Sequence, residues 1–219
     1  MLVAPIFPLP NVVLFPKTVI PLHIFEDRYR RMTREALAGD GRIVIALLQE
    51  GWEPDYVGSP PVHEVACLGR IGRHEELEDG KYNIELEGLQ RVRLVREVQQ
   101  KPYRRAELEL LNQAELPTDA QEVIKRRTRL GGMFTRFTEL STGGKYRAVE
   151  LVPQLDFEVL VNTVATVLNL PSATKQSLLE LDDLTARCDA LVPVLQGQLE
   201  VLLLIQGFEH LKPQDPNLN

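Results

Sequence analysis

The sequence predicts an α+β protein in which a β-rich half precedes a helical half. Before Pro117, apolar and polar residues alternate with the period of two that is typical of strands. After Pro117, apolar residues recur at three- and four-residue spacing, which is typical of helices. We therefore expect a β-rich domain over residues 1–116, a helical bundle over residues 117–212 and a disordered tail over residues 213–219.

The expected strands of the first half end at Gly, Pro or Asp. They are residues 19–25, 43–48, 65–71, 82–86, 92–95 and 103–110. The pair Asp79-Gly80 lies between two of these runs and suits a tight turn with positive φ. A β-hairpin is expected there.

The opening segment, residues 7–32, predicts a strand, a rigid turn, a second strand and a helix. Its prolines cannot donate to a strand ladder, so we expect edge strands and turns around Pro8, Pro10, Pro16 and Pro21. From Asp27 to Ala38 the apolar or small residues follow helical spacing, so one helix is inserted in the β-rich half.

The second half predicts several helices. Thr118 and Gln121 have the spacing of a capping box, which predicts a helix to about residue 140. Residues 157–168 form the next expected helix, and Ser172 and Asp182 are expected to cap two more. Pro193 is expected to kink or split the last of these.

Composition narrows the class of partner and the cellular compartment. The net charge of −6 is spread over both halves, which disfavours attraction to a nucleic acid backbone. Cys67 and Cys188 lack the spacing of a disulfide framework, which favours a reducing compartment. The sequence shows neither a signal peptide nor an apolar run of about 20 residues. We expect a soluble, cytoplasmic protein that does not associate with membranes.

Residue patterns for chemistry are missing from the sequence. The glycines do not have the spacing of a phosphate-binding loop, and no serine lies in the glycine-flanked turn of hydrolases. His63, Cys67 and His74 would lie too far apart on an extended chain to share one metal ion. We expect a protein that is not an enzyme and uses no metal or cofactor.

Two features stand out as possible binding elements. The basic cluster at residues 125–129 is most simply a solvated helix face, with an acidic or nucleic acid partner as the alternative. Trp52 lies with Tyr56 in a loop rich in Gly and Pro. It either caps the barrel or acts as a rigid aromatic anchor for a bound chain.

Three stretches resemble the amino-terminal, substrate-binding domain of Lon proteases. They are FPLPNVVLFPKTVIPLHIFEDRYRRM, VACLGRIGRHEELEDGKYNIELEGLQRVRL and NLPSATKQSLLELDDLTARCDAL, and the resemblance covers residues 5–207. One departure is Lys17, where the family usually has Gly, so the turn there is expected to be looser or of another type. The Lon family continues into ATPase and peptidase domains, which do not follow in these 219 residues.

The resemblance implies a PUA-like β-barrel followed by a helical bundle, and a non-catalytic module that binds unfolded or exposed apolar polypeptide. The implied partners are client polypeptides and, for an adaptor, a separate ATP-dependent protease that receives them. The alternatives are an RNA-binding PUA-like module and an adaptor that recognises one specific protein. A third possibility is an autonomous peptidase. We expect a monomer, with a dimer as the alternative.

The candidate contacts for a bound polypeptide are aromatic and basic residues. All the aromatic ones suit a core equally well, and the inward periodicity of Phe25 and Tyr29 favours the core for these two. The two arginines either steer acidic parts of a ligand or merely decorate a strand. The full set is Phe15, Phe25, Tyr29, Trp52, Tyr56, Arg91 and Arg93.

Overall fold

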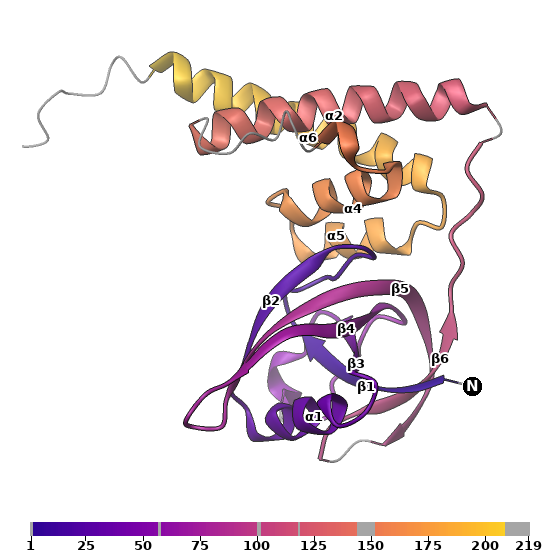
Figure 1. Ribbon diagram of the computed structural model, residues 1–219, viewed down its shortest axis with the longest axis vertical. Helices are drawn as coiled ribbons and strands as arrows, with labels where there is room; N and C mark the ends of the chain where they lie inside the picture. The colour runs from indigo at the N-terminus through magenta and orange to yellow at the C-terminus, as the bar shows by residue number, and fades with distance from the viewer. Residues whose placement is uncertain (1, 57, 100–101, 118, 144–151, 209–219) are drawn as a thin grey trace, which may run out of the picture. The chain divides into compact units, whose positions relative to one another are not determined.

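The computed structural model describes residues 2–56, 58–99, 102–117, 119–143 and 152–208 (Figure 1). The chain forms two compact units. A barrel unit comprises Met1–Glu115 and Ala165–Asp183, and a helical unit comprises Leu116–Val164 and Leu184–Asn219. The predicted tail, residues 213–219, lies outside the described residues.

The barrel unit contains a six-stranded sheet in the order β2-β5-β4-β3-β1-β6. A further pairing of β5 with β6 closes β5, β4, β3, β1 and β6 into a barrel, to which β2 is added at one side (Figure 1). The α+β class is confirmed. The strands are β1 Leu2–Leu9, β2 Val19–Ile24, β3 Arg42–Leu47, β4 Val65–Glu76, β5 Tyr82–Gln99 and β6 Arg105–Leu110.

The strand β5 is one continuous element, whereas the sequence analysis expects two strands on either side of Gly88. Its first part pairs with β2 and its last part pairs with β6, while β4 lies along its other edge. The expected hairpin is confirmed, because β4 and β5 are antiparallel and Gly80 takes a φ of 73° in the turn between them.

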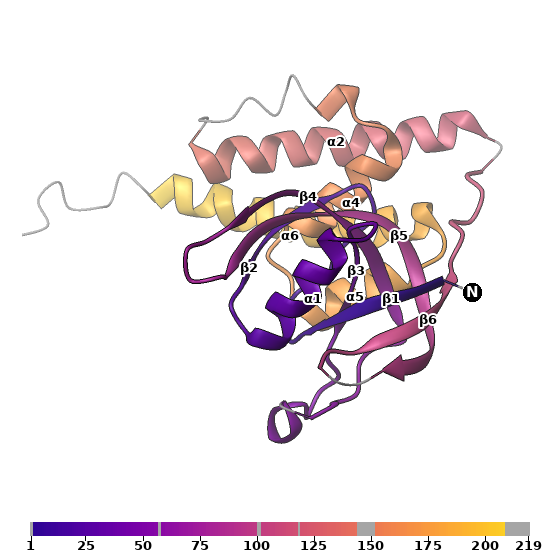
Figure 2. The same ribbon diagram turned by 60° about the horizontal axis from the view of Figure 1, so that its bottom comes forward.

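The helix α1, Asp27–Leu37, packs against the barrel beside β1 (Figure 2). Tyr29, Met32 and Ala36 face the barrel and join a core cluster with Phe7 and Ile43. A short 3-10 helix, η1, spans Glu53–Asp55 in the loop between β3 and β4. The expected inserted helix is therefore present at the predicted residues.

The prolines of the opening segment do not all lie in edge strands. β1 pairs with β6 through Leu2–Pro5 and with β3 through Ile6–Leu9, so it is an interior strand of the sheet. Pro5 and Pro8, which have no amide hydrogen to donate, are compatible with this position because at each of them β1 pairs with one neighbouring strand only. Pro21 does lie in an edge strand, since β2 pairs with β5 alone among the described strands.

The turn at residues 15–18 is tight despite the lysine in it. Lys17 has a φ of 60°, the sole positive φ among the described non-glycine residues, and Pro16 precedes it. The Thr18 hydroxyl donates to the Phe15 carbonyl at 2.8 Å, and the Lys17 amide donates to the Gly88 carbonyl at 2.7 Å. The turn thus keeps a glycine-like conformation, contrary to the expectation of a looser one.

Replacing Lys17 with glycine is expected to stabilise the barrel unit. A left-handed conformation costs a non-glycine residue about 1–2 kcal/mol. The greater freedom of glycine in the unfolded chain offsets about 0.4–1 kcal/mol of this gain. We expect Lys17→Gly to raise the free energy of unfolding by about 0.5–1 kcal/mol in urea denaturation. A lower value than wild type would contradict the strain inferred here.

Residues 165–183 belong to the barrel unit and not to the helical bundle, where the sequence analysis places them. They include α5, Ser172–Glu180. The Arg91 side chain, 2% exposed, donates to the Leu179 carbonyl at 3.1 Å and to Asp182 Oδ1 at 2.7 Å. The Gln176 amide donates to the Val65 carbonyl at 2.8 Å. These buried polar contacts attach α5 to β4 and β5.

The helical unit is built around two long helices that pack against each other, α2 and α6. Asp119 caps α2 by accepting from the Gln121 amide at 2.9 Å, and the expected cap residue Thr118 lies outside the described residues. The buried Arg187 donates to the Asn162 side chain at 2.7 Å. The remaining elements are α2 Ala120–Thr142, η2 Val152–Gln154, α4 Phe157–Val167, whose last residues lie in the barrel unit, and α6 Leu184–Phe208.

The last helix differs from expectation in three ways. Pro193 lies inside a continuous α6, and Asp182 is a partner of Arg91 rather than a cap of this helix. Residues Leu184–Gly207 are also long and apolar enough, by length and composition alone, to cross a membrane, which the sequence analysis does not anticipate. Leu191 and Leu195 of α6 are fully buried, whereas Val201, Leu203, Leu204 and Ile205 toward its C-terminal end are exposed.

Candidate functional site

The free side of β2 is the first feature of the candidate site. β2 pairs with β5 in antiparallel register from Val19 opposite Glu87 to Ile24 opposite Tyr82. Just before this region the Gly88 amide donates to the Thr18 carbonyl at 2.8 Å. Bonded and non-bonded pairs alternate along an antiparallel ladder. The backbone groups of residues 19, 21 and 23 therefore point away from β5, toward the free edge.

Pro21 fits this arrangement because a proline has no amide to donate. Its position on the outward side leaves the ladder between β2 and β5 intact. The free edge then offers the amides of Val19 and His23 and the carbonyls of residues 19, 21 and 23. An incoming strand would meet this partial set of donors and a full set of acceptors.

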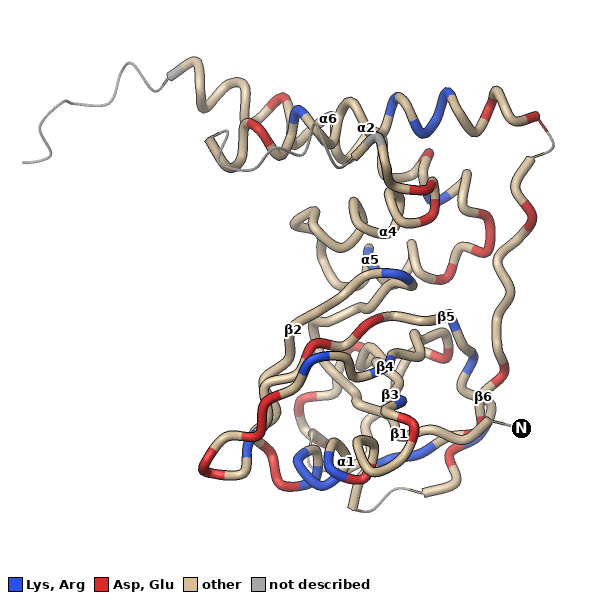
Figure 3. Tube along the Cα trace, in the orientation of Figure 1, with Lys and Arg blue, Asp and Glu red and all other residues tan. Residues whose placement is uncertain are grey.

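On the exposed face of the sheet, the three neighbouring strands β2, β5 and β4 carry different kinds of side chain. Residues directly opposite one another lie on the same face. The β2 residues Val19 and Pro21 lie beside the acidic β5 residues Glu87 and Glu85, and Arg70 of β4 is opposite Glu87. The hairpin that joins β4 to β5 also carries several acidic residues (Figure 3). The face is thus apolar at the free edge and charged farther in.

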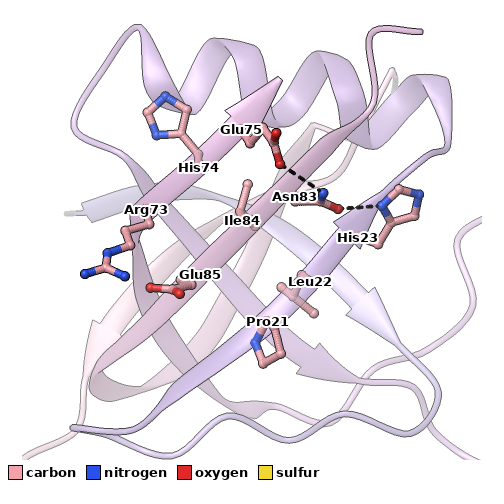
Figure 4. Close-up of a pocket in the computed structure, with 9 residues that line it drawn as sticks. All are labelled: Pro21, Leu22, His23, Arg73, His74, Glu75, Asn83, Ile84 and Glu85. Atoms are coloured by element: carbon pink, nitrogen blue, oxygen red, sulfur yellow. Dashed lines mark hydrogen bonds between the residues drawn. The ribbon is translucent and has the colours of Figure 1, made fainter. Parts of the chain in front are cut away.

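An open depression of about 490 Å³ lies on this part of the sheet (Figure 4). Three consecutive residues from each strand line it, namely 21–23 of β2, 73–75 of β4 and 83–85 of β5. His23 Nδ1 is 2.8 Å from Asn83 Oδ1, which fits a proton on Nδ1, and the Asn83 amide donates to Glu75 at 3.4 Å. These bonds fix the side chains at one end of the depression.

Phe25 follows directly after β2 and is 58% exposed. Its ring stacks on the ring of His23, with 6.1 Å between the centroids. Val19 is 53% exposed at the other end of the strand. Exposed large apolar side chains therefore lie at both ends of the open edge.

Among the predicted contact residues, several are buried and not available to a ligand. Phe15 is completely buried and Tyr29 is 3% exposed. Phe25, for which inward periodicity is expected to favour the core, is instead exposed, because it continues the outward positions 19, 21 and 23 of β2, while residues 20, 22 and 24 face inward. Arg91 is buried by its contacts to residues 179–182, and the exposed Arg93 pairs with Glu109 at 2.8 Å.

Trp52 and Tyr56 do meet, in the loop that carries η1. Their rings form an edge-on contact with 5.4 Å between centroids. Tyr56 donates to Glu26 at 2.5 Å, and the Arg28 guanidinium lies over the Tyr56 ring at 5.1 Å. Burial, followed by the bond to Glu26, raises the pKa of Tyr56. These contacts attach the loop to the start of α1, and neither aromatic residue lines the depression.

The structure also shows how the basic cluster at residues 125–129 and the candidate metal ligands are placed. In the basic cluster, Arg126 forms an ion pair with Asp189 at 3.0 Å and Arg127 donates to the Leu155 carbonyl at 3.1 Å. Within the described residues, no three His, Cys, Asp or Glu side chains gather as they would around a metal ion.

None of the nine residues that line the depression is among the contacts predicted from the sequence. The available signal was Pro21 itself. A proline within an apolar alternating run predicts an edge strand, and an edge strand has unpaired backbone groups. Aromatic residue type was the weaker guide.

The family comparison covers most of the chain. The family described as the ATP-dependent protease La (LON) substrate-binding domain matches residues 3–197. The chain belongs to this family. The Lon substrate-binding domain family therefore accounts for the barrel unit and for most of the helical unit.

Full-length relatives of this Lon substrate-binding domain are Lon proteases. The Lon protease of Xanthomonas oryzae pv. oryzae is 27% identical over 201 residues, which are 90% of this chain and 23% of that protein. Lon protease 2 of Syntrophobacter fumaroxidans is 28% identical over 204 residues, 93% of this chain and 25% of that protein. The chain thus spans about a quarter of the length of these relatives.

Solved structures of Lon amino-terminal domains share the fold. The N-terminal domain of the Mycobacterium avium complex Lon protease superposes with a TM-score of 0.70 at 18% identity, covering 89% of this chain and 98% of that one. The Lon N-terminal domain protein from Xanthomonas campestris has a TM-score of 0.61 at 22% identity, covering 88% and 98%. At these identities the likeness shows the fold alone.

Proposed function

We propose that this chain is a non-catalytic module that binds unfolded or exposed apolar polypeptide segments along β2. The observation that carries the proposal is the open edge of β2 with exposed apolar residues at its ends. A segment in extended conformation adds to such an edge through main-chain hydrogen bonds, and its side chains find their places on the sheet face. The family's description as a substrate-binding domain supports a polypeptide ligand.

Exposed edge strands normally carry features that prevent indiscriminate pairing. Pro21 acts in this way, since it removes one donor from the middle of the edge. Glu85 and Glu87 add negative charge next to it. Binding is therefore expected to require apolar side chains that contact Phe25 and Val19 as well as backbone pairing. Folded proteins, which bury such segments, should bind weakly.

The first test is a titration of a labelled, permanently unfolded polypeptide, followed by fluorescence anisotropy. Phe25→Ser is expected to weaken binding about tenfold, because burying a large apolar side chain contributes about 1.5–3 kcal/mol. His23→Pro removes an outward amide and is expected to weaken binding by a similar factor. Wild-type affinity in both variants would exclude β2 as the site.

The matched control is Val95→Ser on β5. Val95 is 53% exposed, similar to Phe25, and lies outside the residues that line the depression. Its replacement should leave binding unchanged. A folded protein of the same size serves as the second control, and equal affinity for folded and unfolded chains would contradict the proposal. Trp52 emission is expected to stay constant during the titration.

Other expectations about partners stay predictions. An RNA ligand is disfavoured by Glu85 and Glu87 beside the open edge, because carboxylates repel phosphates. Salt-sensitive retention of RNA in a filter assay would contradict this. A pull-down tests the delivery of bound polypeptides to a separate ATP-dependent protease and the recognition of one specific partner. Sedimentation tests the monomeric state, and cell fractionation tests the cytoplasmic location.

A further inference from the structure

The outward residues of β2 are each aligned with one residue of β5 across the exposed face of the sheet. The three rows are Val19 with Glu87, Pro21 with Glu85 and His23 with Asn83. Residues directly opposite one another on neighbouring strands share a face. A strand added to the open edge of β2 would therefore extend each row by one side chain, and the residues already in the row would decide which side chain fits.

The two outer rows already contain partners for their polar groups. Glu87 lies opposite Arg70 of β4. His23 Nδ1 is 2.8 Å from Asn83 Oδ1, and the Asn83 amide donates at 3.4 Å to Glu75, the β4 residue opposite it. A side chain added to either outer row would meet a surface whose charges or hydrogen bonds are balanced.

The middle row ends in a carboxylate without a partner. The register of β4 against β5 shifts between Ile71 and His74, so that Glu85 has no paired residue on β4. Arg73 lies in this irregularity and lines the same depression (Figure 4). Within the described part of the chain, however, the Glu85 carboxylate forms no hydrogen bond and no ion pair. It is therefore available to a positive charge that comes from the open edge.

The charge around Glu85 is negative as well. Among the charged residues that line the depression, Glu75 and Glu85 outnumber Arg73. Residues 70–87, which contain the hairpin of β4 and β5, hold six acidic and three basic residues. This surplus attracts a cationic side chain and repels an anionic one.

Pro21 lies between the open edge and Glu85 and offers an apolar surface. Its ring is exposed and has no polar atom. Neighbouring strands are about 4.8 Å apart, so an added strand would lie about 10 Å from β5. A short polar side chain could not cross this distance. Lysine and arginine can, because their aliphatic stems pack along apolar surface while the charged head reaches beyond it.

We propose that the open edge of β2 prefers an extended segment with a lysine or arginine beside Pro21 and apolar residues two positions before and after it. The basic side chain crosses the Pro21 ring to the Glu85 carboxylate. The apolar side chains lie on the same face, one beside Val19 and one beside His23, on which the Phe25 ring stacks. This preference presupposes the polypeptide binding along β2 proposed above.

The test uses labelled seven-residue peptides that differ only in the central residue, which is Lys, Gln or Glu. Each has Leu two positions before and after the centre and Thr elsewhere. In anisotropy titrations with the full chain, the Lys peptide should bind about two- to fivefold more tightly than the Gln peptide, as expected for an exposed ion pair. The Glu peptide should bind most weakly. A Lys moved by one position would lie on the other face and should give no advantage.

Two variants of Glu85 locate the contact. Glu85→Gln should make the Lys and Gln peptides bind equally, and Glu85→Lys should invert the order, so that the Glu peptide binds more tightly than the Lys peptide. Glu78→Gln is the matched control, because Glu78 is an exposed acid in the turn of the same hairpin and lies outside the depression. It changes the net charge by the same amount and should keep the wild-type preference.

The outcomes separate this preference from the proposed function. Equal affinity of the wild-type chain for all three peptides would overturn the preference, and if Phe25→Ser still weakens all of them, binding along β2 would stand without it. An unchanged preference in Glu85→Gln would exclude the contact. An equal loss of preference in Glu78→Gln would mean attraction by net charge instead of contact with Glu85. Failure of every peptide to bind would overturn both proposals.

Discussion

Replacing Arg91 with methionine is expected to lower the free energy of unfolding of the barrel unit by about 2–4 kcal/mol. The guanidinium is 2% exposed and also donates to the Asn112 carbonyl at 3.3 Å, so its loss leaves several buried carbonyl groups without a donor. Breaking a fully buried ion pair costs about 3–5 kcal/mol. Asp182 is 71% exposed and can be rehydrated, which places the expected loss below the upper limit.

Urea denaturation measures this loss, and amide hydrogen exchange locates it. The amides of α5 should exchange faster in Arg91→Met than in wild type. Arg93→Met is the matched control, because Arg93 lies two residues away on β5, is 46% exposed and pairs with Glu109 at the surface. Its replacement should cost less than about 1 kcal/mol. Similar losses in both variants, or unchanged exchange in α5, would refute the role given to Arg91.

Replacing Gly88 with alanine is expected to destabilise the barrel unit by about 3 kcal/mol or more. A Cβ atom at this position would lie 2.1 Å from the Phe15 carbonyl oxygen and 2.9 Å from its carbon. Both are backbone atoms, and the Lys17 amide holds the same turn to the Gly88 carbonyl. Relief of the clash therefore requires the turn or β5 to shift, which is the costly form of overpacking.

Thermal unfolding of Gly88→Ala checks this prediction, with Gly72→Ala as the control. The nearest atom to a Cβ at Gly72, the Glu85 carbonyl oxygen, lies 3.6 Å away, an ordinary contact. Gly72→Ala should therefore unfold within a few degrees of wild type. A midpoint for Gly88→Ala equal to that of Gly72→Ala would show that the turn at residues 15–18 is free to move.

Local pattern was sufficient to predict most of the barrel elements. Strand periodicity, the Asp79-Gly80 turn and the helical spacing after Asp27 depend on neighbours within a few residues, and the structure confirms them. Gly88 was misleading. A glycine in a strand pattern predicts a strand end, whereas here its lack of a Cβ lets the turn at residues 15–18 approach a continuous β5.

Long-range contacts account for the assignments that failed. Arg91 looks like any arginine of an alternating strand, and its partner Asp182 is 91 residues away in the sequence. Residues 165–183 have helical spacing whichever unit they join, so the sequence pattern assigns them to the nearest helices. Burial against a distant strand leaves no local signal.

The candidate site was predicted in its backbone but not in its side chains. Pro21 predicted an edge strand, and the pairing of β2 confirms it. The choice of contacts by aromatic type included Phe15 and Tyr29, which are buried. Whether an aromatic ring faces the core depends on the phase of the strand, and Phe25 is exposed because it has the same parity as the outward residues 19, 21 and 23.

The attachment of residues 165–183 to the barrel has a consequence for the order in which the molecule can be assembled during translation. Arg91 emerges from the ribosome 91 residues before Asp182. At about 5–20 residues per second, this is a wait of about 5–18 s. During that time the side chain has to remain hydrated or find temporary partners. The barrel unit therefore cannot be completed until Asp183 has been synthesised, long after its last strand, and an expression fragment cut at residue 116 would carry the same incomplete surface permanently.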